Sequence, residues 1–309
     1  RSAFEVRHLL ADLDYQETIN FSFVEARWEH ELAGNADPIK VLNPIAAPLS
    51  VMRSSLVGSL VQVLRHNLAR KAGRVRVFEI GRVAMRDASV LASDTTVAGV
   101  HQPMRVAGLA FGPADATQWG SKERTVDFFD VKGDVERLLA PQAVSFKPVD
   151  HPALHPGRSA QVLANGVVIG VVGELHPRWR QAYELSGAPV LFELDLAAVL
   201  ARQVPAAQSI AKHQATWRDL ALVVPESATH DGLVNALRDD PSGLVKAATS
   251  FDVYKPAAPV GDMKAGERSM AVRIELLDLQ ATLTEERIDA AVADAVARVA
   301  LQVGARLRA

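Results

Sequence analysis

The stretch SFDVYK, residues 250–255, places an aromatic ring and a carboxylate where a flat, hydrogen-bonding ligand could use them. Alternate side chains of a β-strand face opposite sides, so we expect Phe251 and Val253 to point into a core and Asp252 and Tyr254 to share an outer face. A ring can stack on a nucleobase, and a carboxylate can accept hydrogen bonds from a base edge. An ordinary solvated strand alternates in the same way, and the pattern by itself favours that plainer interpretation.

Neighbouring segments extend this face. Alternation in WRDLALVVP, ERSMAVRIELLD and ARLRA predicts the following outward side chains: Asp219, Ala221, Val223, Ser269, Ala271, Arg273, Arg306 and Arg308. The middle of this face then has small side chains, and the face carries a ring, a carboxylate, a hydroxyl and one or two guanidiniums. Single-stranded RNA recognition uses these groups, although the pattern does not specify RNA.

Two other groups of polar residues could suggest a metal site. The first comprises Asp127, Asp130, Asp134 and Glu136. These residues lie at the start of a predicted helix, where acids suit the helix dipole, so helix capping is the favoured interpretation. The second is His151 and His155, but Pro152 and Pro156 prevent a regular helix there and favour a turn. We therefore predict no metal site and no catalytic residue in this chain, and packing roles for Trp119 and Trp179.

Composition sets broad limits on the function. The 309 residues are 49% hydrophobic and 23% charged, which is typical of a soluble globular protein with room for two domains. The net charge of -2 excludes a broadly basic protein that coats nucleic acid, but not local RNA recognition. Cysteine is absent, which favours a reducing compartment, and neither a membrane span nor a signal peptide is visible. Because the chain opens with Arg1, we expect a fragment or a processed piece.

The first two thirds of the chain predict a largely antiparallel sheet that carries helices, which is an α+β fold. A short helix at the start is followed by a strand at residues 17–24, and a helix capped by Ser54 or Ser55 precedes the strand RVRVFEIGRVAM. That strand alternates with an apparent shift of one residue before Phe78. Asn165-Gly166 predicts a hairpin turn between two further strands.

After a linker at residues 205–214, the last part of the chain reads as a compact β-α-β-β-α-β unit over residues 215–309. Its helices are expected to begin near Thr229 or Asp231 and at Thr284, and the second helix should end at Gly304. This order is the ferredoxin-like arrangement, in which two helices cover one face of the sheet and leave the other bare.

Many stretches in a fixed order now support a resemblance that covers nearly the whole chain. They include DYQETINFSFV, VLNPIAAPLSVMRSSLVGSLVQVLRHN, DFFDVKGDVERLL, GVVGELHP, RDLALVV, FDVYK, ERSMAVRIEL and GARLR. In these motifs the chain resembles the C-terminal part of the β subunit of bacterial phenylalanyl-tRNA synthetase. The resemblance implies a class II synthetase-like domain without catalysis at residues 1–204, followed by a ferredoxin-like anticodon-binding domain.

The resemblance also implies the residues that hold the anticodon. An Asp and a Tyr on one strand, a Ser on the next and an Arg near the C-terminus fall on Asp252, Tyr254, Ser269 and Arg308. All four lie on the outer face predicted from alternation. We expect a base to stack on Tyr254, Asp252 and Ser269 to form hydrogen bonds with base edges, with the Asp252 carboxylate as acceptor, and Arg308 to make a cationic contact.

The first domain is not expected to activate ATP. The segment around Arg82 and Arg86 resembles the second class II motif, whose arginine grips the α-phosphate. The Gly-rich third motif is absent where PVLFELDLAAVLAR stands. We therefore expect Arg82 and Arg86 to form surface or interface salt bridges.

As a member of this family, the chain would work in the cytoplasm in an (αβ)₂ heterotetramer with the catalytic α subunit. It would bind tRNA(Phe), would need no cofactor of its own and would have no membrane partner, with ATP and Mg²⁺ used by the full synthetase. The alternatives are an autonomous class II-like ligase and a paralogous protein-interaction module.

Overall fold

The computed structural model describes residues 1–202, 206–207 and 210–308, which fall into two compact units divided between residues 204 and 205. The predicted linker at 205–214 includes positions 205, 208 and 209, which lie outside the described residues. In the described ranges, no helix is long and apolar enough to cross a membrane.

A seven-stranded sheet forms the centre of the first unit, in the order β1-β4-β7-β11-β10-β9-β8. Its strands are β1 (Gln16–Glu17), β4 (Val75–Arg82), β7 (Met104–Phe111), β8 (Val144–Pro148), β9 (Leu154–Ala164), β10 (Val167–Leu175) and β11 (Val190–Asp195). Strand β1 runs parallel to β4, and the other neighbouring pairs are antiparallel. Two small sheets pair β2 (Phe23–Val24) with β3 (Val51–Met52) and β5 (Met85–Arg86) with β6 (Val100–His101).

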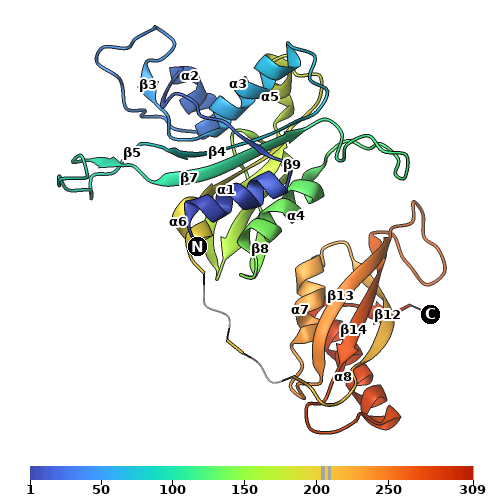
Figure 1. Ribbon diagram of the computed structural model, residues 1–309. Coiled ribbons are helices and arrows are strands. Elements are labelled where there is room, and N and C mark those ends of the chain that lie inside the picture. The colour runs from blue at the N-terminus through green and yellow to red at the C-terminus, as the bar shows by residue number, and fades with distance from the viewer. Residues whose placement is uncertain (203–205, 208–209, 309) are drawn as a thin grey trace. The chain divides into compact units, whose positions relative to one another are not determined.

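Helices cover both faces of this sheet (Figure 1). One face packs against α1 (Ala3–Asp12), α4 (Phe128–Leu139) and α6 (Leu196–Leu200). The other packs against α3 (Val57–Leu68) and α5 (Pro177–Ala182), beside α2 (Ala26–Trp28) and a π-helical turn (Glu29–Ala33).

Burial on both faces explains the apparent shift in the β4 sequence. Val75 and Val77 belong to the core under α3, whereas Phe78 belongs to the core under α1 and α4. The pairing of β4 with β7 runs without interruption, so the predicted shift is wrong. A strand that is covered on both sides carries apolar residues at consecutive positions.

Two local predictions are confirmed in the first unit. Asp127 caps α4: its Oδ1 accepts hydrogen bonds from the backbone N–H groups of Phe129 and Asp130, and the Asp130 carboxylate accepts one from the Asp127 N–H. Asn165 and Gly166 join β9 to β10 with φ angles of 51° and 79°, as a two-residue turn with both φ values positive requires. The acidic run therefore begins as a helix cap.

Two other local predictions are wrong because distant groups decide the local structure. The expected strand at 17–24 is split: β1 ends at Glu17, and Asn20 turns its side-chain amide onto the Glu79 carboxylate, 2.8 Å away. Helix α3 has Leu56 at its N-cap, not Ser54 or Ser55. The acceptor for the Leu56 N–H is the Glu193 carboxylate on β11, at 2.7 Å.

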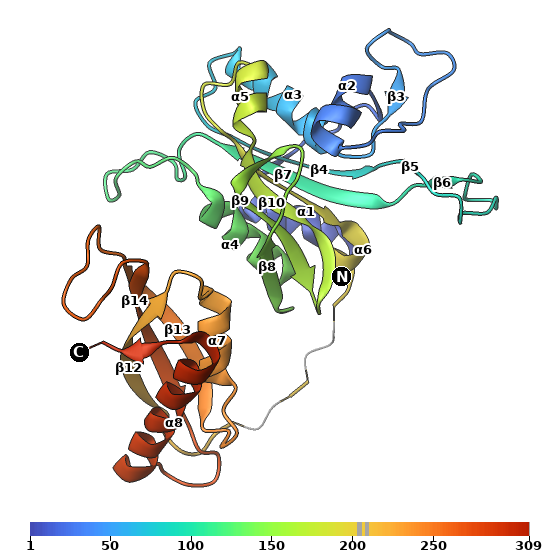
Figure 2. The same cartoon turned by 180° about the vertical axis from the view of Figure 1, so that it is seen from behind.

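The second unit has the predicted β-α-β-β-α-β order. Its elements are β12 (Thr216–Pro225), α7 (His230–Arg238), β13 (Val245–Tyr254), β14 (Glu267–Leu276), α8 (Glu285–Val303) and β15 (Arg306–Leu307). The sheet order β13-β14-β12-β15, antiparallel throughout, is ferredoxin-like. Thr229 and Thr284 cap the two helices, and α8 ends at Gly304 with a φ of 69°, as predicted. Both helices pack on one face of the sheet (Figure 2).

Candidate nucleic-acid interface

The face of the second sheet opposite α7 and α8 is covered by no helix of the described part of the second unit. We call it the open face. Strand register arranges its side chains in four rows across β12, β14 and β13: Trp217–Glu275–Ala247, Asp219–Arg273–Thr249, Ala221–Ala271–Asp252 and Val223–Ser269–Tyr254. Arg306 and Arg308 join it from the β15 edge.

Tyr254 and Arg308 meet across the sheet although they start from opposite edges. The Arg308 backbone N–H donates to the Ala221 carbonyl at 2.8 Å, which places this residue beside β12. Its guanidinium carbon lies 5.4 Å from the centroid of the Tyr254 ring on β13. Because Ala221 and Ala271 carry only methyl groups, the arginine can lie over them to reach the ring. Tyr254 stays 42% exposed, and Asp252 is exposed in the next row.

Ser269 and Val223 lie on the open face by register but are not exposed on it. Ser269 is 5% exposed and Val223 is fully buried. Ser269 pairs directly with Tyr254 across the strands. The register therefore confirms the predicted side of the sheet for Ser269, but its side chain is buried there and not exposed.

A β-bulge puts Phe251 and Asp252 on the same face, contrary to the prediction that Phe251 points into the core. Register shifts between Ser250 and Asp252, so Phe251 is the extra residue of β13. Its ring is 56% exposed and lies 5.6 Å from the Arg273 guanidinium carbon, on the open face. A bulge puts two successive side chains opposite one residue of the partner strand and commonly redirects a side chain. Val253 faces the core side with Met270, as predicted, but is 54% exposed on the edge strand.

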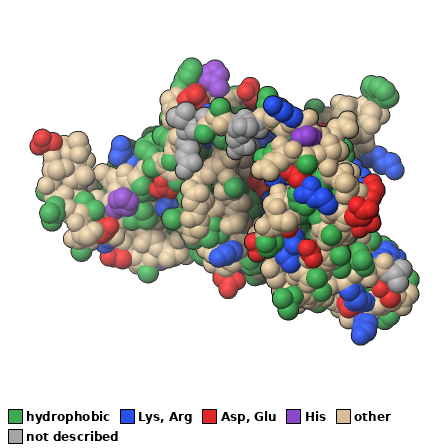
Figure 3. Space-filling view, turned by 90° about the horizontal axis from the view of Figure 1, so that it is seen from below, with side chains coloured by type: hydrophobic (Ala, Val, Ile, Leu, Met, Phe, Trp, Pro, Cys, Tyr) green, Lys and Arg blue, Asp and Glu red, His purple; other side chains and the backbone are tan. Residues whose placement is uncertain are grey.

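Charge on the open face is mostly paired. Arg273 binds Asp219 through two hydrogen bonds of 2.7 Å, which lowers the pKa of the aspartate and raises that of the arginine. Arg306 binds Glu267 at 2.7 Å, and this contact lowers the carboxyl pKa to about 2. Among the described residues, no carboxylate lies within salt-bridge distance of Arg308. Figure 3 shows basic and acidic side chains interspersed over the side of the chain that is in view.

In the first unit, the arginines of the segment that resembles the second class II motif are engaged in structural contacts. The Arg82 guanidinium donates to the Gln102 carbonyl at 3.0 Å, and Arg86 pairs with Asp37 at 2.9 Å on the surface. The predicted salt bridge is therefore confirmed for Arg86 but not for Arg82.

The residues of the first unit that were considered as metal ligands make contacts within the protein. Asp134 binds the Tyr15 hydroxyl at 2.9 Å, and Glu136 pairs with Lys132 at 2.5 Å. No group of three or more possible metal ligands occurs in the parts of the chain that the structure describes. His151 lies at a turn, whereas His155 lies in β9, so the turn is confirmed only for His151.

The two tryptophans differ in their surroundings. Trp179 is a packing residue, 7% exposed, and its indole N–H donates to the Pro152 carbonyl at 2.7 Å. Trp119 is fully exposed, so the packing role predicted for it is wrong.

Sequence reasoning missed a buried ion pair in the first unit. Arg53 and Glu79 lie 2.7 Å apart with side chains 3% and 4% exposed. Asn20 adds a hydrogen bond to Glu79, and the Arg53 Nε–H donates to the Arg82 carbonyl at 3.2 Å. The only hint in the sequence is a charged residue inside an apolar strand, which does not identify its partner.

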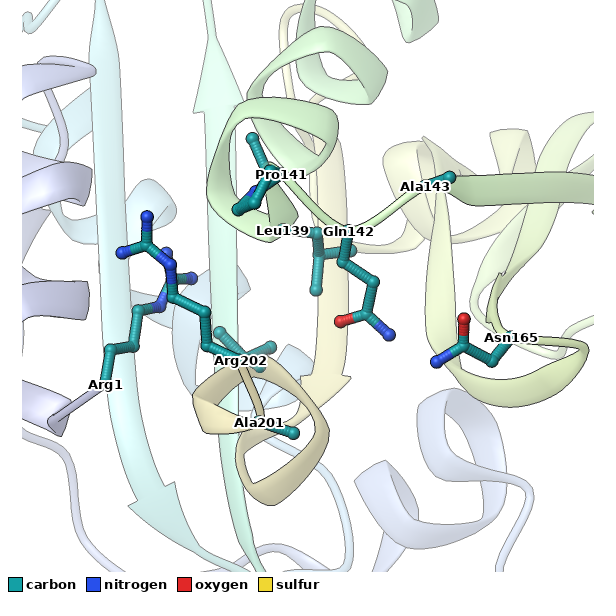
Figure 4. A pocket seen from close by; sticks show the side chains of 10 residues that line it. Arg1, Leu139, Pro141, Gln142, Ala143, Asn165, Ala201 and Arg202 are labelled. Carbon is teal, nitrogen blue, oxygen red and sulfur yellow. The ribbon is translucent and has the colours of Figure 1, made fainter. Parts of the chain in front are cut away.

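A cavity of about 410 Å³ lies in the first unit between the end of α4 and the end of α6 (Figure 4). Arg1 and Arg202 line it together with the amides of Gln142 and Asn165. The Arg1 guanidinium donates to the Leu138 carbonyl, so it satisfies the end of α4. Burial and the neighbouring Arg202 lower the pKa of Arg1. The described contacts of this cavity therefore serve the helix end and do not indicate a ligand.

Comparison with known proteins identifies both units. Residues 1–196 match the family described as the phenylalanyl tRNA synthetase beta chain CLM domain. Residues 211–308 match the ferredoxin-fold anticodon binding domain.

Similar relatives carry the name phenylalanine–tRNA ligase beta subunit. The protein of Cupriavidus pinatubonensis is 51% identical over the whole of this chain and 38% of its own length. That of Burkholderia pseudomallei is 49% identical over 39% of its length, and that of Chromobacterium violaceum is 46% identical over 38%. The chain thus spans a little over a third of the length of these relatives.

Among solved structures, a pyrrolysyl tRNA synthetase of Desulfitobacterium hafniense, PylSc, aligns at a TM-score of 0.45 and 10% identity. The alignment covers 64% of this chain and 66% of that one. This score is too low to carry an argument about the fold.

The family matches follow the two units in order, and the relatives align along the entire chain. We conclude that the chain belongs to the phenylalanyl-tRNA synthetase beta chain family.

Proposed function

We propose that the second unit binds the anticodon of tRNA(Phe) through its open face, as part of the β subunit of phenylalanine–tRNA ligase. The observation that carries this proposal is the approach of the Arg308 guanidinium to the Tyr254 ring, at 5.4 Å, next to the row that holds Asp252 and two alanines. A stacking ring, an acceptor without a salt-bridge partner and a cation on one surface suit single-stranded RNA. The match to an anticodon-binding domain family supports this assignment.

Each of the four residues has a distinct role in this proposal. Tyr254 offers its exposed ring to one base, and Asp252 accepts hydrogen bonds from a base edge. Arg308 contacts a phosphate or a base from the opposite edge of the sheet. Ser269, which pairs with Tyr254 across the strands and is 5% exposed, supplies its hydroxyl only to a group that reaches this buried position.

For the first unit we propose a non-catalytic, class II synthetase-like domain that supports the catalytic α subunit in a cytoplasmic (αβ)₂ assembly. The largely antiparallel sheet with helices on both faces supports this proposal. The Arg82 guanidinium donates to the Gln102 carbonyl and Arg86 pairs with Asp37, and both contacts support a structural role for this segment. ATP and Mg²⁺ would therefore be used by the rest of the synthetase, and this unit would need no cofactor.

The anticodon proposal is tested by Tyr254→Ala and Arg308→Ala in the assembled synthetase, with tRNA(Phe) affinity and aminoacylation as readouts. Loss of stacking at Tyr254 should weaken binding by about 1–3 kcal/mol. Tyr254→Phe is the matched control, because it keeps the ring and should stay close to the parent protein. If both alanine variants bind and charge tRNA(Phe) normally, the open face is not the anticodon site.

The role of the first unit is tested by co-expression with the α subunit. The proposal expects the two chains to purify together, and phenylalanine-dependent ATP–pyrophosphate exchange to require the α subunit. Exchange by this chain alone would contradict the non-catalytic assignment.

A further inference from the structure

The open face continues well beyond Tyr254 and carries two more exposed aromatic rings. Trp217 is 55% exposed and Phe251 is 56% exposed. Both line a shallow pocket of about 370 Å³, together with Ala247, Thr249, Arg273 and Glu275. The register places every paired residue of this lining on the open face, so the pocket and Tyr254 belong to one surface.

Strand β13 contributes three alternate side chains to this pocket, Ala247, Thr249 and Phe251. The register shift that follows Ser250 brings Asp252 to the same face as Phe251. The Arg273 guanidinium carbon lies 5.6 Å from the centre of the Phe251 ring. Asp219 holds the Arg273 guanidinium through two hydrogen bonds, so the ring and the cation are already in place before any ligand arrives.

We infer that Phe251 and Trp217 form a second base-stacking subsite, which holds a nucleotide that flanks the anticodon in the tRNA loop. This inference rests on the proposed anticodon function and extends it along the same sheet. The Trp217 row and the Val223 row, which contains Tyr254, are six positions apart along β12, which is about 20 Å of strand. The surface is therefore long enough for more than one base.

The charges of the pocket favour a base over a phosphate. Asp219 neutralises Arg273, and Glu275 adds a negative charge to the lining. A phosphate would meet these carboxylates, whereas a base can stack on a ring whatever its sequence.

The test uses Phe251→Leu and Trp217→Leu in the assembled synthetase, because leucine keeps apolar bulk and cannot stack. Affinity is measured for tRNA(Phe) and for the same tRNA with an abasic nucleotide immediately 5′ or 3′ of the anticodon. We expect each leucine variant to bind intact tRNA about 5- to 100-fold more weakly. One of the two abasic tRNAs should bind the parent protein about as weakly as intact tRNA binds the leucine variants. The leucine variants should bind that abasic tRNA little more weakly than they bind intact tRNA.

Controls separate stacking from a folding defect. Phe251→Tyr and Trp217→Phe keep a ring at each position and should retain affinity. Trp119→Leu removes an exposed ring outside the open face and should change nothing. The subsite would be overturned if the leucine variants bound intact tRNA with the affinity of the parent protein. It would also be overturned if the leucine substitutions weakened the binding of intact tRNA and of both abasic tRNAs by the same factor. If Tyr254→Ala still weakens binding in that case, the anticodon proposal stands without the subsite; if Tyr254→Ala has no effect either, the anticodon proposal itself fails.

Discussion

At the scale of single residues, the buried pair of Arg53 and Glu79 is the most demanding feature of the first unit. Both side chains are almost inaccessible, and each has a further hydrogen-bond partner. Removal of one member leaves the other charge buried without a counter-charge. Such losses are strongly destabilising, whereas exposed pairs contribute little.

We therefore expect Glu79→Gln to lower the free energy of unfolding of the first unit by about 3–5 kcal/mol. Asp37→Asn is the matched control, because its pair with Arg86 is exposed, and it should cost about 0–1 kcal/mol. Urea unfolding can be followed by fluorescence in a Trp217→Phe background, where Trp28, Trp119 and Trp179 all report on the first unit. Similar losses for both variants would contradict the structure.

At the scale of elements, α4 shows how a short sequence pattern positions a helix. Asp127→Ala removes an acceptor for two backbone N–H groups and should destabilise the first unit by about 0.5–2 kcal/mol. Glu136→Ala on the same helix breaks only a surface pair with Lys132 and should cost about 0.3–0.5 kcal/mol. The same urea assay compares them. If Glu136→Ala lowered the free energy of unfolding more than Asp127→Ala, the Asp127 cap would not be what stabilises the start of α4.

Strand β13 shows the opposite case, in which a regular pattern misleads. The alternation in SFDVYK predicts one ring on the open face, but the bulge puts two there. The inserted residue breaks the period of two only locally, and the sequence contains no glycine or proline that marks the break.

At the scale of the whole molecule, the near-neutral net charge and the paired arginines predict weak dependence of anticodon binding on salt. Each phosphate contact to a single strand adds about 0.7 to the steepness, which is the magnitude of the slope of log affinity plotted against log salt concentration. Arg308→Ala should therefore reduce the steepness for the assembled synthetase by about 0.7. Arg306 is paired with Glu267, so Arg306→Gln should leave the steepness unchanged. A titration of tRNA(Phe) binding from low to moderate salt measures both, and a change with Arg306 alone would contradict these assignments.

The sequence by itself determined the ferredoxin-like order of the second unit, its helix caps, the Asn165-Gly166 turn and the placement of Asp252 and Tyr254 on the open face. These features follow from local rules: period-two alternation, capping side chains and positive φ at the turn.

Only the tertiary structure decided the features that depend on distant partners. Glu193 on β11 replaces the expected serine cap of α3, and Glu79 draws Asn20 out of the predicted strand. The bulge puts Phe251 and Asp252 on the same face, and Ser269 is buried although its register places it on that face. The approach of Arg308 to Tyr254 also joins the two edges of a four-stranded sheet. Such contacts form between residues far apart in the chain, where no local pattern specifies which groups meet.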